Sequence, residues 1–122
     1  LNGLTAFAVA LPVAFLSGLI MTTYGRGFKE GWITLILLSA TAVISATLGV
    51  IGQAIASVGR MWSGFFLNVV WAVVCLASTW HLKGLGAKGL ALAMLLAYGV
   101  HLVTVGLYTR FVVVNRYFGE KE

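Results

Sequence analysis

The feature that most constrains this chain is a stretch of about 19 residues, from Trp62 to Trp80, without a formally charged side chain. An α-helix of that length rises ~1.5 Å per residue and covers roughly the ~30 Å of hydrocarbon in a bilayer. Tryptophans stand at both of its ends, where amphipathic rings favour the membrane interface. The stretch is therefore predicted to be a transmembrane helix.

Composition extends this prediction to the whole chain. Of its 122 residues, 61% are hydrophobic and 9% are charged, and the mean hydropathy is +1.02. A soluble domain of this size could not cover so much apolar surface. The apolar runs are continuous rather than alternating, and backbone groups in lipid must be paired within the segment, so we expect helices and not barrel strands. The predicted fold class is all-α, a polytopic bundle of membrane helices.

Four transmembrane helices are expected, at about residues 4–24, 32–58, 62–80 and 87–108, in a single segment that covers residues 1–122. Pro12 lies near the middle of the first helix and removes a backbone hydrogen bond, which predicts a kink. An even number of spans places both termini on one side of the membrane. The tail, residues 110–122, is basic, aromatic and then charged, which predicts a position on the membrane surface.

Two rows of small or polar residues recur at every fourth position. One row predicts a single face of the second helix turned away from lipid, and consists of Thr41, Ser45, Gly49, Gln53 and Ser57. The other predicts a ridge on the fourth helix that a neighbouring helix can approach closely, and consists of Gly89, Ala93 and Ala97. His101 continues this ridge, so its imidazole is expected to point into the protein. A histidine in a membrane span is a functional candidate, and a hydrogen-bonded structural role is the alternative.

Three polar residues are expected at one depth. Gln53 and Asn68 lie about seven and eight residues from Arg60, and His101 lies about nine residues before Arg110. At the helical rise, each is therefore ~10 to 14 Å inside the membrane face that carries these two arginines. An unpaired polar group in hydrocarbon costs several kcal/mol, so the three side chains should meet one another or line a hydrated cavity. The sequence leaves both possibilities open.

Several function classes lack the residues that they need. The net charge of +5 comes from basic residues scattered over helix ends and tail, which indicates membrane anchoring and not nucleic-acid binding. The chain has no Asp, and its Glu residues lie outside the spans, so no enzymatic acid–base pair is expected. Cys75 is single and offers neither a disulfide nor a cysteine metal site. No cofactor is predicted, because His81 and His101 lie ~21 Å apart in depth and are unsuited to one haem iron.

An ordered set of short motifs covers almost the whole chain. They are Leu11-Pro12, Tyr24 through Trp32, Gly52-Gln53-Ala54, Gly59 through Trp62, Asn68 through Ala72, Gly86 through Ala93, Ala97-Tyr98 and His101. The set resembles the C-terminal part of bacterial polysaccharide flippases, the O-antigen type transporters of the multidrug/oligosaccharidyl-lipid/polysaccharide exporter superfamily.

The resemblance implies a function, partners and a location. These transporters move undecaprenyl-pyrophosphate-linked oligosaccharide across the bacterial inner membrane, and the resemblance places both termini and Arg60 at the cytoplasmic face. Charge does not decide orientation, because four basic residues fall on each side. Gln53, Asn68 and His101 would form part of a substrate cavity, and Arg60 would supply positive charge at its mouth.

Four spans are fewer than one lobe of a two-lobed transporter, so we expect a piece of a longer protein that cannot transport alone. The chain also begins at Leu1 without an initiator methionine. The remaining helices or a partner subunit would then be partners, together with membrane lipid. Two alternatives stay open, a small multidrug exporter and a small structural subunit. The exporter would be expected to use an intramembrane acid, and the spans have none.

Overall fold

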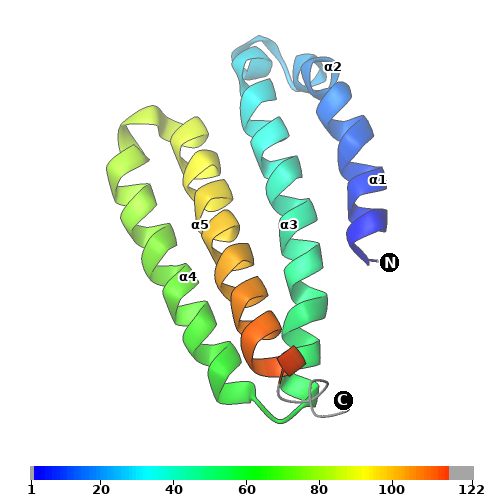
Figure 1. Ribbon diagram of the computed structural model, residues 1–122. Helices are drawn as coiled ribbons and strands as arrows, with labels where there is room; N and C mark the ends of the chain where they lie inside the picture. Colours follow the sequence, from blue (N-terminus) through cyan, green and yellow to red (C-terminus); the bar gives the residue numbers. More distant parts are fainter. Residues whose placement is uncertain (1, 116–122) are drawn as a thin grey trace.

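The computed structural model describes residues 2–115 of the chain, with side chains from Leu4 onward. Within these residues the structure is an all-α bundle without strands, which confirms the predicted fold class. Across the bundle the helices follow the order α1, α3, α5, α4 (Figure 1). The helix α5 thus lies between α3 and α4, although α4 precedes it in the chain.

The predicted helices are present. The first is broken into α1 (Asn2–Phe15) and α2 (Ser17–Thr23), and the others are α3 (Trp32–Ser57), α4 (Met61–Leu82) and α5 (Gly86–Tyr108). The limits of α3, α4 and α5 agree with the predicted spans to within one or two residues. Hydropathy and the interfacial tryptophans were therefore sufficient to locate these helices.

Among the described residues, two helical stretches are long and apolar enough to cross a membrane, Arg26–Ser57 and Met61–Val114. The second folds back at the 3-10 turn η2 (Lys83–Leu85), so that α4 and α5 run side by side (Figure 1). Taken together, the bent pair Leu4–Phe15 and Ser17–Thr23 also meets the same criterion. The helices of this chain are suited to a bilayer.

The first helix bends by 65°, but not at the expected position. Pro12 lies inside α1, and the break falls one helical turn later at Leu16, whose amide still donates to the Pro12 carbonyl (2.9 Å). The pair Ser17 and Gly18 follows the break at once, and Gly/Ser pairs are a recognised cause of sharp kinks. Attributing the bend to Pro12 alone was therefore incomplete.

A glycine-based cap ends α3 and begins the turn to α4. The amide of Gly59 donates to the Ala56 carbonyl (3.0 Å), and the amide of Arg60 donates to the Ile55 carbonyl (3.3 Å). This pair of bonds is the Schellman motif, which requires a left-handed residue, and Gly59 supplies it with φ +78°. The motif fixes Arg60 as the residue before α4.

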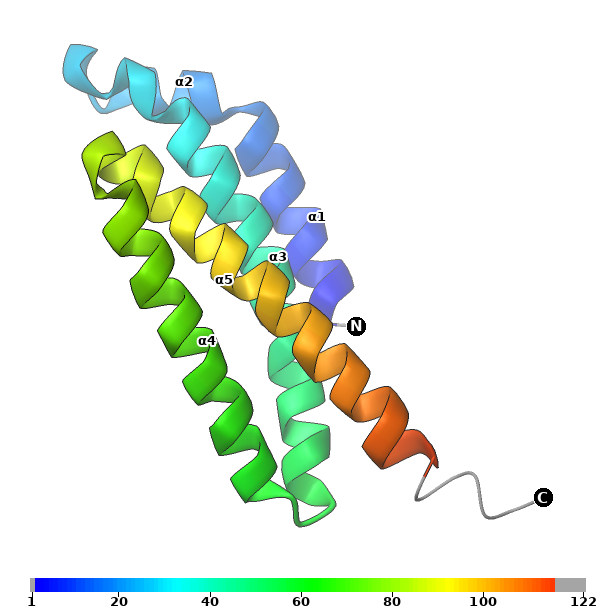
Figure 2. The ribbon, with the colours of Figure 1, turned by 60° about the vertical axis from the view of Figure 1, so that its left-hand side comes forward.

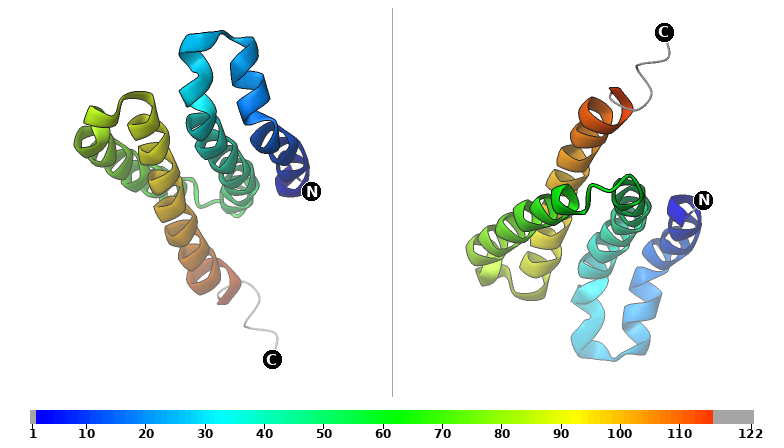
Figure 3. Two further views of the ribbon diagram at one scale, coloured as in Figure 1. Left: turned by 90° about the horizontal axis from the view of Figure 1, so that it is seen from above. Right: turned by 90° about the horizontal axis from the view of Figure 1, so that it is seen from below.

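The helix α5 does not end where the tail was expected to begin. Residues Thr109–Val114 continue it as a π-helical segment, η3. The remaining part of the tail, residues 116–122, lies outside the described residues. Figures 2 and 3 show that α5 crosses the bundle obliquely and that its C-terminal end projects away from the ends of α3 and α4.

The expected ridge on α5 is the most buried part of the described chain. Ala93 and Ala97 have no exposed surface, and the buried residues of α5 are Gly89, Ala91, Ala93, Ala97, His101 and Val105. Val105 joins Leu48 and Ile55 of α3 in a hydrophobic cluster. The prediction that His101 faces into the protein is confirmed, since it is only 8% exposed.

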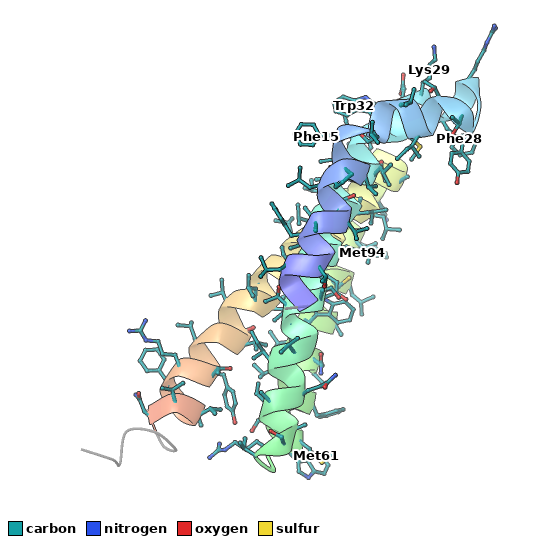
Figure 4. All side chains as sticks on the ribbon, turned by 90° about the vertical axis from the view of Figure 1, so that its right-hand side faces the viewer. Phe15, Phe28, Lys29, Trp32, Met61 and Met94 are labelled. Atoms are coloured by element: carbon teal, nitrogen blue, oxygen red, sulfur yellow. The ribbon has the colours of Figure 1, made fainter. Side chains whose placement is uncertain are left out.

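Large apolar side chains cover the outside of the bundle. Phe15 and Met61 lie towards its two ends and project outward (Figure 4), with 82% and 72% of their surfaces exposed. A soluble protein would bury such side chains, whereas lipid or further helices can cover them at no hydrophobic cost. The surface therefore agrees with the membrane-compatible length of the helices.

Gly89→Ala is expected to destabilise the hairpin of α4 and α5. A Cβ atom at Gly89 would collide with the Leu82 carbonyl oxygen and would lie 2.9 Å from Leu85 Cβ. Overpacking of this kind costs about 1–3 kcal/mol, so we expect a lower melting temperature in detergent, measured by circular dichroism. Gly99→Ala on the same helix is the matched control, because a Cβ there meets nothing within 4 Å. Equal melting temperatures for the two variants would contradict the close approach at Gly89.

Candidate functional site

A cavity of about 290 Å³ lies between α3, α4 and α5. It exists because α5 packs against both α3 and α4, which have much less contact with each other. Its wall is made of Ser45, Leu48, Gly49, Gly52, Ile55, Gly64, Leu67, Asn68, Trp71, Tyr98, His101 and Val105. Among the described residues, no side chain in this wall carries a formal charge when His101 is neutral.

Glycines keep the cavity open. Gly49 and Gly52 of α3 and Gly64 of α4 all line it, and a Cβ atom built on any of the three would meet nothing within 4 Å. Larger side chains at these positions would fill the space between the two helices. The absence of side chains at three wall positions is therefore the local cause of the cavity.

His101 brings a buried imidazole to the cavity wall. The backbone carbonyl of Leu67 on α4 is placed to accept a hydrogen bond from the ring. Its Nδ1 is buried and has no hydrogen-bond partner among the described residues. Buried polar nitrogens are rarely left unpaired, so this atom calls for a ligand or a water molecule.

Trp71 and Tyr98 form the aromatic part of the wall. Their ring centroids are 5.3 Å apart with an interplanar angle of 56°. The indole Nε1 of Trp71 is also buried without a hydrogen-bond partner in the described part of the chain. Two residues of the cavity wall, one each from α4 and α5, thus have a buried nitrogen without a hydrogen-bond partner among the described residues.

The sequence prediction did not assign Trp71 and Tyr98 to the site. Trp71 lies three residues after Asn68, and Tyr98 lies three residues before His101, so each shares a helix face with a predicted site residue. That spacing was the available signal. Because aromatic residues on an apolar face usually only pack, the spacing alone could not separate these two from the other aromatic residues.

Asn68 lines the cavity and remains exposed. Its Nδ2 donates a hydrogen bond to the Gly64 carbonyl one turn earlier (3.0 Å). The bond holds the carboxamide along α4 and leaves its oxygen available as an acceptor. Two of the three residues expected at one level, Asn68 and His101, therefore do line one cavity.

Gln53 does not join them. It is absent from the cavity wall and its side chain is exposed, whereas Gly49 and Gly52 beside it line the cavity. A spacing of four residues advances ~400° around a helix, so each step drifts by ~40° from the starting face. The buried residues Thr41, Leu48 and Ile55 are seven apart and drift far less. The expected grouping of Gln53 with Asn68 and His101 was wrong for this reason.

Arg60 lies beyond one end of the cavity. It is one helical turn before Gly64, and its Nη1 donates a hydrogen bond to the Tyr108 hydroxyl (3.1 Å). Ser63 is also placed to hydrogen bond with that hydroxyl. These contacts tie the connection between α3 and α4 to α5 near the point where α5 leaves the bundle (Figure 2).

The two histidines occupy different environments. His81 is exposed in the last turn of α4, next to the turn η2, whereas His101 is buried in the cavity wall well inside α5. No group of three or more potential metal ligands was found among the described residues.

Comparison of this chain with protein-family models, with curated proteins and with solved structures finds no match. The resemblance to polysaccharide flippases therefore rests on the sequence motifs described above.

Tyr108→Phe is expected to loosen the junction of α3, α4 and α5. The change removes the hydroxyl that accepts from the Arg60 guanidinium, and hydrogen bonds to charged groups contribute about 1.5–3 kcal/mol. We expect faster hydrogen exchange at the amides of residues 58–61, measured by mass spectrometry in detergent. Tyr24→Phe is the matched control, since Tyr24 is exposed and follows α2, which lies at the opposite end of the bundle (Figure 1). Unchanged exchange in the Tyr108 variant would mean that the bond does not restrain this junction.

Proposed function

We propose that this chain is part of a membrane transporter that flips undecaprenyl-pyrophosphate-linked oligosaccharide across the bacterial inner membrane during polysaccharide biosynthesis. The observation that carries the proposal is the cavity between α3, α4 and α5, which has unpaired polar nitrogens inside a bundle with an apolar outer surface. The ordered resemblance to polysaccharide flippases supplies the substrate class.

The depth of the cavity supports a role in moving a polar group through hydrocarbon. Asn68 lies about eight residues into α4 from Arg60, or ~12 Å by helical rise. Polar groups at such depth are costly unless they face a partner or a hydrated space. A lipid-linked sugar must pass this region with its hydroxyl groups solvated, and a cavity with donors and acceptors serves that need.

The cavity wall would be one side of a larger passage. Alternating access requires two lobes that rock about a central site, and this bundle has too few helices for one lobe. The exposed apolar faces of α1 and α4 provide surfaces for the remaining helices or a partner subunit, and lipid would cover the rest. In this proposal the termini and Arg60 lie at the cytoplasmic face. The Arg60 guanidinium would attract the pyrophosphate near the cavity end by charge-assisted hydrogen bonding.

Asn68→Ala and His101→Ala in the complete transporter are expected to reduce surface polysaccharide strongly, with unchanged protein level and melting temperature. The physical reason is the loss of polar groups from the cavity wall. Surface polysaccharide is measured by gel electrophoresis and staining. Gln53→Ala is the matched control, because this carboxamide lies outside the cavity in α3. Loss of folded protein in the Asn68 and His101 variants, instead of loss of export, would favour a purely structural role.

The purified chain of 122 residues, reconstituted alone in liposomes, is expected not to flip a fluorescent lipid-linked oligosaccharide. The reason is the missing second lobe. Flipping is measured by quenching of the outer-leaflet label with dithionite, and protein-free liposomes give the background rate. A rate above background for this chain alone would show that it is a complete transporter.

A further inference from the structure

We propose that the cavity between α3, α4 and α5 binds a single neutral, polyhydroxylated ring, with Trp71, Tyr98 and His101 as its contacts, and that it does not bind the diphosphate. Only the identification of this ring as a sugar unit of the transported lipid rests on the proposed function. The wall residues predict a neutral hydroxylated ligand independently of that function.

Charge argues against an anion in this space. In the described residues no lysine or arginine lines the cavity, and Arg60 lies one turn beyond it with its guanidinium bonded to Tyr108. A phosphate group brought among these side chains would lose hydration without meeting a cation. A neutral ligand avoids that cost.

The unpaired nitrogens match a hydroxyl group. The indole Nε1 of Trp71 can only donate. A neutral imidazole has one N–H donor and one acceptor nitrogen, so the unpaired Nδ1 of His101 accepts in one tautomer and donates in the other. A hydroxyl group can both accept and donate and so matches Nδ1 in either tautomer, whereas an ionised phosphate oxygen can only accept. The amide oxygen of Asn68 adds a second acceptor nearby.

The aromatic pair provides a surface for the apolar face of a ring. Trp71 and Tyr98 are inclined at 56° with centroids 5.3 Å apart, and both line the cavity. The negative face of an aromatic ring attracts the weakly positive C–H groups of a sugar, so one face of the ligand can stack while its rim forms hydrogen bonds. The side chains that bind each part of the ring are thus present in one wall.

Size limits the ligand to one ring. The volume of about 290 Å³ lies just below the ~300–1,000 Å³ range of small-ligand sites. Gly49 and Gly52 form the wall opposite Trp71, and they allow a ring to lie against the α3 backbone. A longer oligosaccharide would have to extend out of the open side of the cavity.

The test uses the chain in lipid nanodiscs with two matched probes, hexyl β-glucopyranoside and hexyl phosphate. Both have the same tail, and only the first has a neutral hydroxylated ring. The readout is the indole ¹H–¹⁵N signal of Trp71, assigned by its loss in Trp71→Phe. We expect a saturable shift of this signal with the glucoside and none with the phosphate. An unmoved signal with both probes would mean that only water occupies the cavity, and an equal response to both would exclude selection for a neutral ring; either result overturns the inference.

Variants locate the binding. Trp71→Phe keeps an aromatic side chain, smaller than the indole, but removes the N–H. Loss of one hydrogen bond should weaken glucoside binding by about 2- to 10-fold, measured by saturation-transfer NMR on the ligand. Gly52→Leu should abolish binding by filling the cavity, while helicity by circular dichroism stays unchanged. Gln53→Ala, next to Gly52 but outside the cavity, should bind as the unmodified chain does. Binding that survives Gly52→Leu would place the ring elsewhere and refute the site.

Glucoside binding and polysaccharide export are measured separately, so failure of one proposal can be distinguished from failure of the other. Glucoside binding at Trp71 together with normal export by Asn68→Ala and His101→Ala transporters would keep the site and reject its role in flipping. Export lost in those variants without any glucoside binding would keep the flippase proposal and reject this inference.

Discussion

The packing of α5 between α3 and α4 is the constraint on which the other features depend. Glycine and alanine along α5 let its backbone approach both neighbours, and at Gly89 the space is too small for even a methyl group. In lipid, helices associate through such close contact and not through a hydrophobic force between them. The order of the helices across the bundle follows from this ridge.

The cavity is a consequence of that arrangement. The helix α5 packs against both α3 and α4, which have much less contact with each other, and the cavity wall includes Gly49, Gly52 and Gly64, whose missing side chains cannot fill the space. Polar nitrogens of Trp71 and His101 then lie inside the bundle without protein partners among the described residues. A structural core would pair or remove such groups, so their presence directs attention to a ligand.

Part of the candidate site could be predicted from residue types alone. Asn68 and His101 stood out because amides and imidazoles are rare and costly in membrane spans. Trp71 and Tyr98 did not, since aromatic residues are common there, and only the register of α4 against α5 brings their rings to 5.3 Å. Arg60 was expected at the cavity mouth, and its contact with Tyr108, 48 positions away in sequence, depends on tertiary packing.

The sequence by itself determined α3, α4 and α5 and their limits, because hydrocarbon requires each span to pair its own backbone groups and interfacial tryptophans mark where a span ends. Only the tertiary structure decided which side chains on those helices are buried. Rows of every fourth residue drift around a helix on both α3 and α5. On α5 the row from Gly89 to His101 stays buried because α3 and α4 cover this helix on two sides. On α3 the same drift leaves Gln53 exposed and outside the cavity wall.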